Sequence, residues 1–115
     1  MKMLKALLID PVSNSVEETE VEASNIRAIY KAIDASTFQC VDLDGRNTVY
    51  VDEESLMNGK GEIPGNVFSI LTSTGITTLI GKALVLGFDA QTGDSVDTTV
   101  SKNQLKRIIT TEVFI

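Results

Sequence analysis

Residues 79–89 have the sequence LIGKALVLGFD, and the fold expected for this chain is built outward from them. Apolar residues occupy both alternations between Ala83 and Phe88, so a strand formed here would be covered on both faces, as in the centre of a sheet. A buried helix fits the same run, but the run is short, is bounded by glycines and lacks helix caps. We therefore expect residues 79–88 to form the central strand.

Two β-hairpins are expected before this strand. Residues 4–9 and 16–22 form the first, joined through the turn residues that follow Asp10-Pro11. The four glutamates of residues 16–22 would keep that edge from pairing with other chains, and an acidic interaction surface is the alternative. Residues 38–43 and 48–52 form the second hairpin, with a four-residue loop.

Two helices are expected to pack on the sheet. The first runs from a cap at Ser24 or Asn25 to about Ala35, because apolar side chains recur at helical spacing there. The second runs from Lys102 to about Ile109. Residues 66–71 are a strand or a helical turn, and residues 95–100 and 110–115 are strand-like. Together these patterns predict one α+β domain over residues 1–115, with an antiparallel or mixed sheet of about five to seven strands packed by two helices.

The formal net charge of −6 lies in the first half of the chain, since residues 1–57 hold eleven acids and five bases, whereas residues 58–115 hold five of each. This balance argues against binding to duplex DNA, because a DNA-binding face needs bases that neutralise phosphates. Acidity ordinarily serves solubility, and mimicry of nucleic acid is the rarer alternative.

Cys40 is the one cysteine, which excludes an intramolecular disulfide and fits a reducing compartment. It lies in an apolar stretch, so we expect a packed, unreactive thiol. The apolar N-terminal segment is interrupted by Lys5 and meets Asp10-Pro11 rather than a signal-peptide cleavage site. No stretch has the length of a membrane span. We therefore expect a cytoplasmic protein with no membrane partner.

Histidine is absent, which removes the commonest general base and the usual nitrogen ligand of zinc. We expect no enzyme, no cofactor and no metal site, although a small hydrolase or transferase without histidine is an alternative. Asp52-Glu53-Glu54 could suggest a metal site, but neighbours on an extended segment point in opposite directions, so solvated charge is expected. The glycine-rich residues 58–66 lack both phosphate-loop spacings.

Polar residues near two turns are the candidate ligand contacts. Hydroxyl-rich segments often satisfy only their own backbone, but residues 72–78 could also hold a polar ligand, with Lys82 as the nearby cation. The loop of the second hairpin adds two more polar residues. The predicted ligand-binding residues are Arg46, Asn47, Thr72, Ser73, Thr74, Thr77, Thr78 and Lys82.

Several blocks of the chain are similar to a family of small phage and plasmid proteins described only as a domain of unknown function. The blocks that carry the resemblance are residues 6–11, 16–21, the helix with Tyr30, 38–43, 50–53, 81–87 and the last helix. The resemblance offers no catalytic residues. It implies a viral accessory protein, of a kind that is often a small acidic binder acting against host systems.

We therefore expect a non-catalytic binding protein of a phage or mobile element that disarms a host defence factor. Its ligand would be a host protein or a sequestered small nucleotide-like signal. A structural module of a larger assembly is the alternative. The apolar residues 113–115 further suggest a homo-oligomer in which residues 110–115 border the interface.

Overall fold

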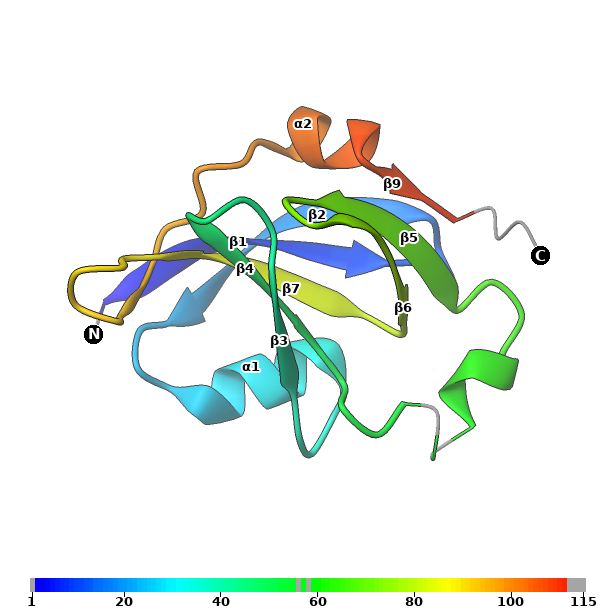
Figure 1. The fold of residues 1–115 in the computed structure, drawn as a ribbon. Coiled ribbons are helices and arrows are strands. Elements are labelled where there is room, and N and C mark those ends of the chain that lie inside the picture. The colour runs from blue at the N-terminus through cyan, green and yellow to red at the C-terminus, as the bar shows by residue number, and fades with distance from the viewer. Residues whose placement is uncertain (1, 56, 58, 112–115) are drawn as a thin grey trace.

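The computed structural model describes residues 2–55, 57 and 59–111. Within this part of the chain, nine strands form two antiparallel sheets, accompanied by two α-helices and one short 3₁₀ helix. Figure 1 shows α1 on one side of the larger sheet and the smaller sheet with α2 on the other. The elements are β1 Met3–Asp10, β2 Ser15–Glu22, α1 Ile26–Ile33, β3 Gln39–Asp42, β4 Asn47–Val51, η1 Lys60–Glu62, β5 Val67–Thr72, β6 Gly75–Ile80, β7 Ala83–Phe88, β8 Ser95–Val96, α2 Lys102–Arg107 and β9 Ile109–Thr110.

The larger sheet, sheet A, has the strand order β2-β1-β7-β4-β3, and β8 also pairs with β7. The expected central strand is confirmed for β7, where Leu7 of β1 and Val49 of β4 both lie opposite Val85. The expected boundary is wrong, because Leu79 and Ile80 belong to β6 of the other sheet. Gly81, at a φ of 88°, lies between the two strands in a conformation that other residues rarely adopt.

Alternate side chains of β7 enter two separate apolar clusters. Ala83 and Val85 face the smaller sheet and α2, in a cluster that includes Phe68, Ile70 and Leu105. Leu84 and Leu86 face α1, in a cluster that includes Ile33. Sheet A is therefore covered on both faces at its centre, as the double alternation of apolar residues predicts.

The smaller sheet, sheet B, has the order β6-β5-β9 and was not expected. The prediction of one sheet with five to seven strands is corrected here, while the α+β class agrees with the mixture of antiparallel sheets and short helices. β5 and β6 form a tight hairpin, since Thr72 pairs directly with Gly75. Their inward side chains pack on sheet A, and this packing makes the hairpin a second layer.

Both helices are shorter than expected. α1 is capped by the Asn25 side chain and ends before Asp34, which has left-handed backbone angles, rather than at Ala35. α2 begins with a capping box between Ser101 and Gln104 and buries Leu105. It ends at Arg107, because Ile109 already pairs with Ile70 of β5.

Both predicted hairpins are confirmed, and β2 forms an edge of sheet A. The expected strand over residues 95–100 is limited to β8. Of the expected strand over residues 110–115, Thr110 belongs to β9, and residues 112–115 lie outside the described residues. Among the described residues, no helix combines the length and the apolar character needed to cross a membrane.

Candidate functional site

A cleft lies where the β3–β4 loop, the β5–β6 turn and the segment around α2 come together. Its volume is about 510 Å³. We call it the inter-sheet cleft. Its apolar lining residues are Leu43, Leu71, Val100 and Ile108, and its polar lining residues are Asp44, Thr72, Ser73, Thr99 and Gln104. Three stretches that are distant in the sequence thus form one concave surface.

The β5–β6 turn is fixed against the end of β3 at one wall of this cleft. The Ser73 N–H donates to the Leu43 carbonyl at 2.8 Å, and Ser73 Oγ donates to Asp42 Oδ2 at 3.1 Å. Thr72 Oγ1 donates to the Gly75 carbonyl at 2.8 Å. The hydroxyls of Thr72 and Ser73, which were predicted to meet a ligand, are therefore already held by the protein, as hydroxyl-rich turns often are.

Asn47 holds the opposite wall in place. Its side chain is 0% exposed. Nδ2 donates to Thr99 Oγ1 at 2.8 Å and to both oxygens of Asp44, while Oδ1 accepts from Thr98 Oγ1 at 2.7 Å and from the Thr99 N–H at 3.1 Å. Every polar atom of the amide thus has a protein partner, so Asn47 positions the cleft and offers nothing to a ligand.

The predicted ligand residues divide between two ends of sheet B. Thr72 and Ser73 line the cleft, Arg46 lies in the β3–β4 loop beside Asp44, and Asn47 is the first residue of β4. Exposed Thr74 lies in the β5–β6 turn. The other candidates lie farther along the chain: Thr77 and Thr78 are on β6, where Thr78 Oγ1 is 3.0 Å from Ser69 Oγ, and Lys82 follows β6 at its far end. The structure therefore separates Lys82 from the turn that it was expected to serve.

Seven lining residues were not predicted from the sequence. Leu43, Asp44 and Leu71 adjoin predicted positions, whereas a distant segment of the chain supplies Thr99, Val100, Gln104 and Ile108. They reach the cleft because Asn47 bonds the chain at Thr98 and Thr99. The position of Asn47, close to the buried residues Val49 to Val51, was the one signal that could have indicated a buried polar contact.

The charge of the cleft is slight and negative. Among the described residues that line it, Asp44 is the one charged residue, and none is a lysine or an arginine. Its Oδ1 accepts from the N–H groups of Arg46 and Asn47 at 3.0 and 2.8 Å. This arrangement suits a neutral or cationic ligand and provides no group that would neutralise a phosphate.

A second hollow of about 440 Å³ lies beside β1 and β2, on the same face of sheet A as α2. It is lined by Lys5 and Lys102 together with Glu18 and Glu20. None of the predicted ligand residues lines it, and its charges are of both signs. We therefore take the inter-sheet cleft as the candidate site.

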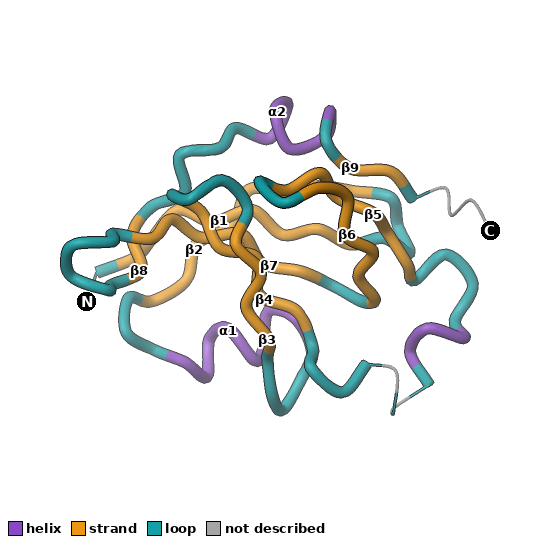
Figure 2. The backbone as a smooth tube through the Cα atoms, viewed as in Figure 1, coloured by secondary structure: helices purple, strands orange, loops and turns teal. Residues whose placement is uncertain are grey.

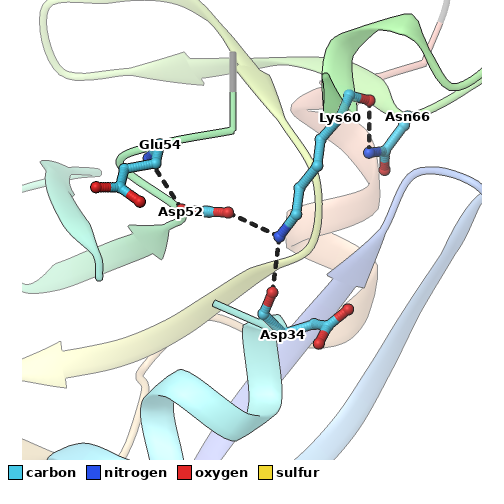
Figure 3. A network of polar contacts seen from close by, with 5 residues as sticks. All are labelled: Asp34, Asp52, Glu54, Lys60 and Asn66. Atoms are coloured by element: carbon cyan, nitrogen blue, oxygen red, sulfur yellow. Dashed lines mark hydrogen bonds and ion pairs between the residues drawn. The ribbon is translucent and has the colours of Figure 1, made fainter. Parts of the chain in front are cut away.

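The expectation that Asp52 is solvated is wrong. Asp52 is 4% exposed and forms an ion pair of 2.7 Å with Lys60 Nζ. Figure 3 shows that Lys60 also donates to the Asp34 carbonyl, at 2.7 Å, and that the Lys60 carbonyl accepts from Asn66 Nδ2 at 2.9 Å. We call this the Asp52–Lys60 clamp. It fastens the loop before β5 to the ends of α1 and β4.

No group of three or more histidine, cysteine, aspartate or glutamate residues suited to a metal ion occurs among the described residues. The expectation of a packed thiol is also wrong, because Cys40 is exposed on the edge strand β3. Partial burial still raises the pKa of the Cys40 thiol, since desolvation disfavours the thiolate.

Neither the curated proteins nor the solved structures contain a match to this chain. A family model does match, and it covers residues 1–111, nearly the whole chain. The match includes every strand and helix described above, together with the inter-sheet cleft and the Asp52–Lys60 clamp. The chain therefore belongs to the family described as a domain of unknown function, DUF3846.

Proposed function

We propose that this protein is a non-catalytic binding protein that holds a segment of another protein in the inter-sheet cleft. The observation that carries the proposal is the composition of the lining, which combines four apolar side chains, hydroxyls held by hydrogen bonds within the protein, and Asp44 as the one charged residue among the described lining residues. Apolar walls with a few fixed polar groups are typical of binding sites.

Of the two ligand classes expected from the sequence, the charge of the cleft favours a protein over a nucleotide. A nucleotide phosphate is usually met by arginine, lysine or a helix N-terminus. No arginine or lysine lies among the lining residues that the structure describes, and Lys82 lies at the other end of β6. A neutral or basic protein segment does not need a cationic group in the cleft, and Asp44 attracts positive charge.

The nature of the partner follows from the resemblance to mobile-element proteins rather than from the fold. A host factor that is disarmed by occupation of its surface fits a small acidic binder without a catalytic group. The alternative role as a structural module would also use this cleft for protein contacts, and the identity of the captured partner distinguishes the two.

A paired variant tests the site. Ser73→Arg places a long cationic side chain at the mouth of the cleft beside Asp44 and Asp42. Ser36→Arg makes the same change at an exposed position near α1, away from the cleft. A partner captured from host lysate and then purified should bind wild type and Ser36→Arg equally in calorimetry. We expect its affinity for Ser73→Arg to fall at least tenfold, or about 1.4 kcal/mol.

A thermal-shift series with mono-, di-, tri- and cyclic nucleotides tests the alternative that the ligand is a nucleotide. We expect no concentration-dependent rise in melting temperature, because a ligand that does not bind the native state does not stabilise it. If a nucleotide raises the melting temperature of the wild type but not that of Ser73→Arg, the ligand of the cleft is a nucleotide rather than a protein. Equal partner binding by both arginine variants would show that the cleft is not the site.

A further inference from the structure

One edge of sheet B is open in the part of the chain that the structure describes. β6 is the outer strand and pairs with β5 alone. β3, the nearest edge of sheet A, approaches it at the turn, where Ser73 bonds to Leu43. Figure 2 shows the two strands separating from there.

One hydrogen bond shows which backbone N–H and C=O groups of β6 point toward β5 and which point toward the open edge. The Gly81 N–H donates to the Asn66 carbonyl at 2.9 Å, so these two residues form a hydrogen-bonded pair that extends the register of β5 and β6. Such pairs alternate along an antiparallel ladder. The N–H and C=O groups of Ile76, Thr78 and Ile80 therefore point away from β5, toward the open edge.

This edge carries no charge. No residue from 63 to 81 is acidic or basic, whereas the edge strand β2 of sheet A carries glutamates at 17, 18, 20 and 22. The side chains beside the edge are apolar or hydroxylic, and Ile76 is 77% exposed. Proteins usually protect such edges with charge, proline or a covering segment, because an open edge recruits another strand.

We infer that β6 pairs with β6 of a second copy of this chain, forming a two-fold symmetric dimer with a continuous six-stranded sheet. The partner is a second copy because the strand is complementary to itself. With Thr78 on the two-fold axis, Thr78 lies opposite Thr78 of the other copy, and Ile76 lies opposite Ile80. Residues 76, 78 and 80 are those whose backbone groups point outward, so this register satisfies them all.

The charge distribution supports the same partner. Each copy has a formal charge of −6, so two copies repel unless they meet through a neutral surface. The β6 edge is such a surface, and β2 is not. This contact differs from the one expected at residues 110–115, because β9 is the opposite edge of sheet B.

Two charge variants at the symmetry axis test both the dimer and its register. Thr78→Glu and Thr78→Lys each place like charges opposite one another across the axis, which is destabilising in a strand pair. Light scattering at micromolar concentration should give wild type twice the 12.4 kDa chain mass and each variant alone the single mass. An equimolar mixture of the two should recover the doubled mass, because glutamate then faces lysine.

Gln91→Glu is the matched control, since it adds the same charge as Thr78→Glu in an exposed turn; it should remain dimeric. Circular dichroism confirms that each variant is folded, so loss of the dimer is not loss of the fold. A monomeric wild type, or Thr78 variants that stay dimeric, would overturn the proposal. Failure of the mixture to recover the dimer would overturn the register. None of these measurements needs the binding partner, so they are independent of the proposed function.

Discussion

The two sheets of this molecule meet solvent in different ways. Sheet A is buried on both faces at β7 and is bordered by β2, whose exposed side chains are largely glutamates. Sheet B buries one face only, exposes Leu71 and Ile76 on the other and has no charged residue in any of its strands. The first arrangement favours a stable monomeric layer, and the second leaves a face and an edge available for contacts.

This difference suggests a division of roles between the sheets. Stability is determined by the buried side chains of sheet A, by the inward-facing side chains of sheet B and by the links between the two sheets. The residues available for binding lie along sheet B and in the cleft that it forms with α2. Substitutions at the first group of residues should therefore lower stability, and substitutions at the second group should change binding or association.

Val85→Asp should have the largest effect. Val85 is 0% exposed, and an unpaired carboxylate there costs several kcal/mol, a large part of the stability of a small domain. We expect an unfolded protein by circular dichroism. Leu71→Asp on the outer face of sheet B is the control, and it should lose no more than about 1 kcal/mol in urea unfolding. Equal losses would remove the distinction between the sheets.

Lys60→Met should have the next largest effect, because it leaves the buried Asp52 carboxylate without its ammonium partner. We expect the free energy of unfolding to fall by about 3 kcal/mol. Adding Asp52→Asn should restore part of this loss, since the amide carries no charge. Lys31→Met, at an exposed position on α1, should have little effect. Hydrogen exchange should show faster opening of β5 and β6 in Lys60→Met, and unchanged exchange there would argue against the clamp.

The glutamates of β2 should matter for association rather than for stability. Glu17→Thr with Glu18→Thr removes two exposed charges from this edge and should promote concentration-dependent association, measured by light scattering. The free energy of unfolding should change by less than about 1 kcal/mol. Glu53→Thr with Glu62→Thr makes the same change in charge away from the edge. If both pairs associate equally, net charge rather than edge protection is responsible.

Cys40→Ser should have the smallest effect, below about 0.5 kcal/mol, because the side chain is exposed. In the wild type, a thiol reagent should label the native protein, but slowly at neutral pH, since burial raises the pKa of Cys40 and reduces the thiolate fraction. The folded state favours the neutral thiol, so any contribution to stability is present at low pH and is lost as pH rises through the thiol range. Immediate labelling at pH 7 would contradict the raised pKa.

Local patterns in the sequence were sufficient to predict β7, both hairpins and the positions of the two helices, because periodicity and turn residues depend on neighbours in the chain. Sheet B was missed because Leu79 and Ile80, which precede the turn at Gly81, were assigned to the apolar run of β7. The cleft was predicted only on the side of Thr72 and Ser73. Its other wall depends on the bonds of Asn47 to Thr98 and Thr99, which join residues about fifty positions apart.

The central place of β7 also sets the order in which the chain can fold. The β1–β2 and β3–β4 hairpins are local and can form early, but neither can join the other until β7 enters between them. The pairing of Leu7 with Val85 spans most of the chain. Such distant contacts slow folding. During synthesis, the edges of β1 and β4 that later pair with β7 therefore stay unpaired until residue 88 has emerged from the ribosome.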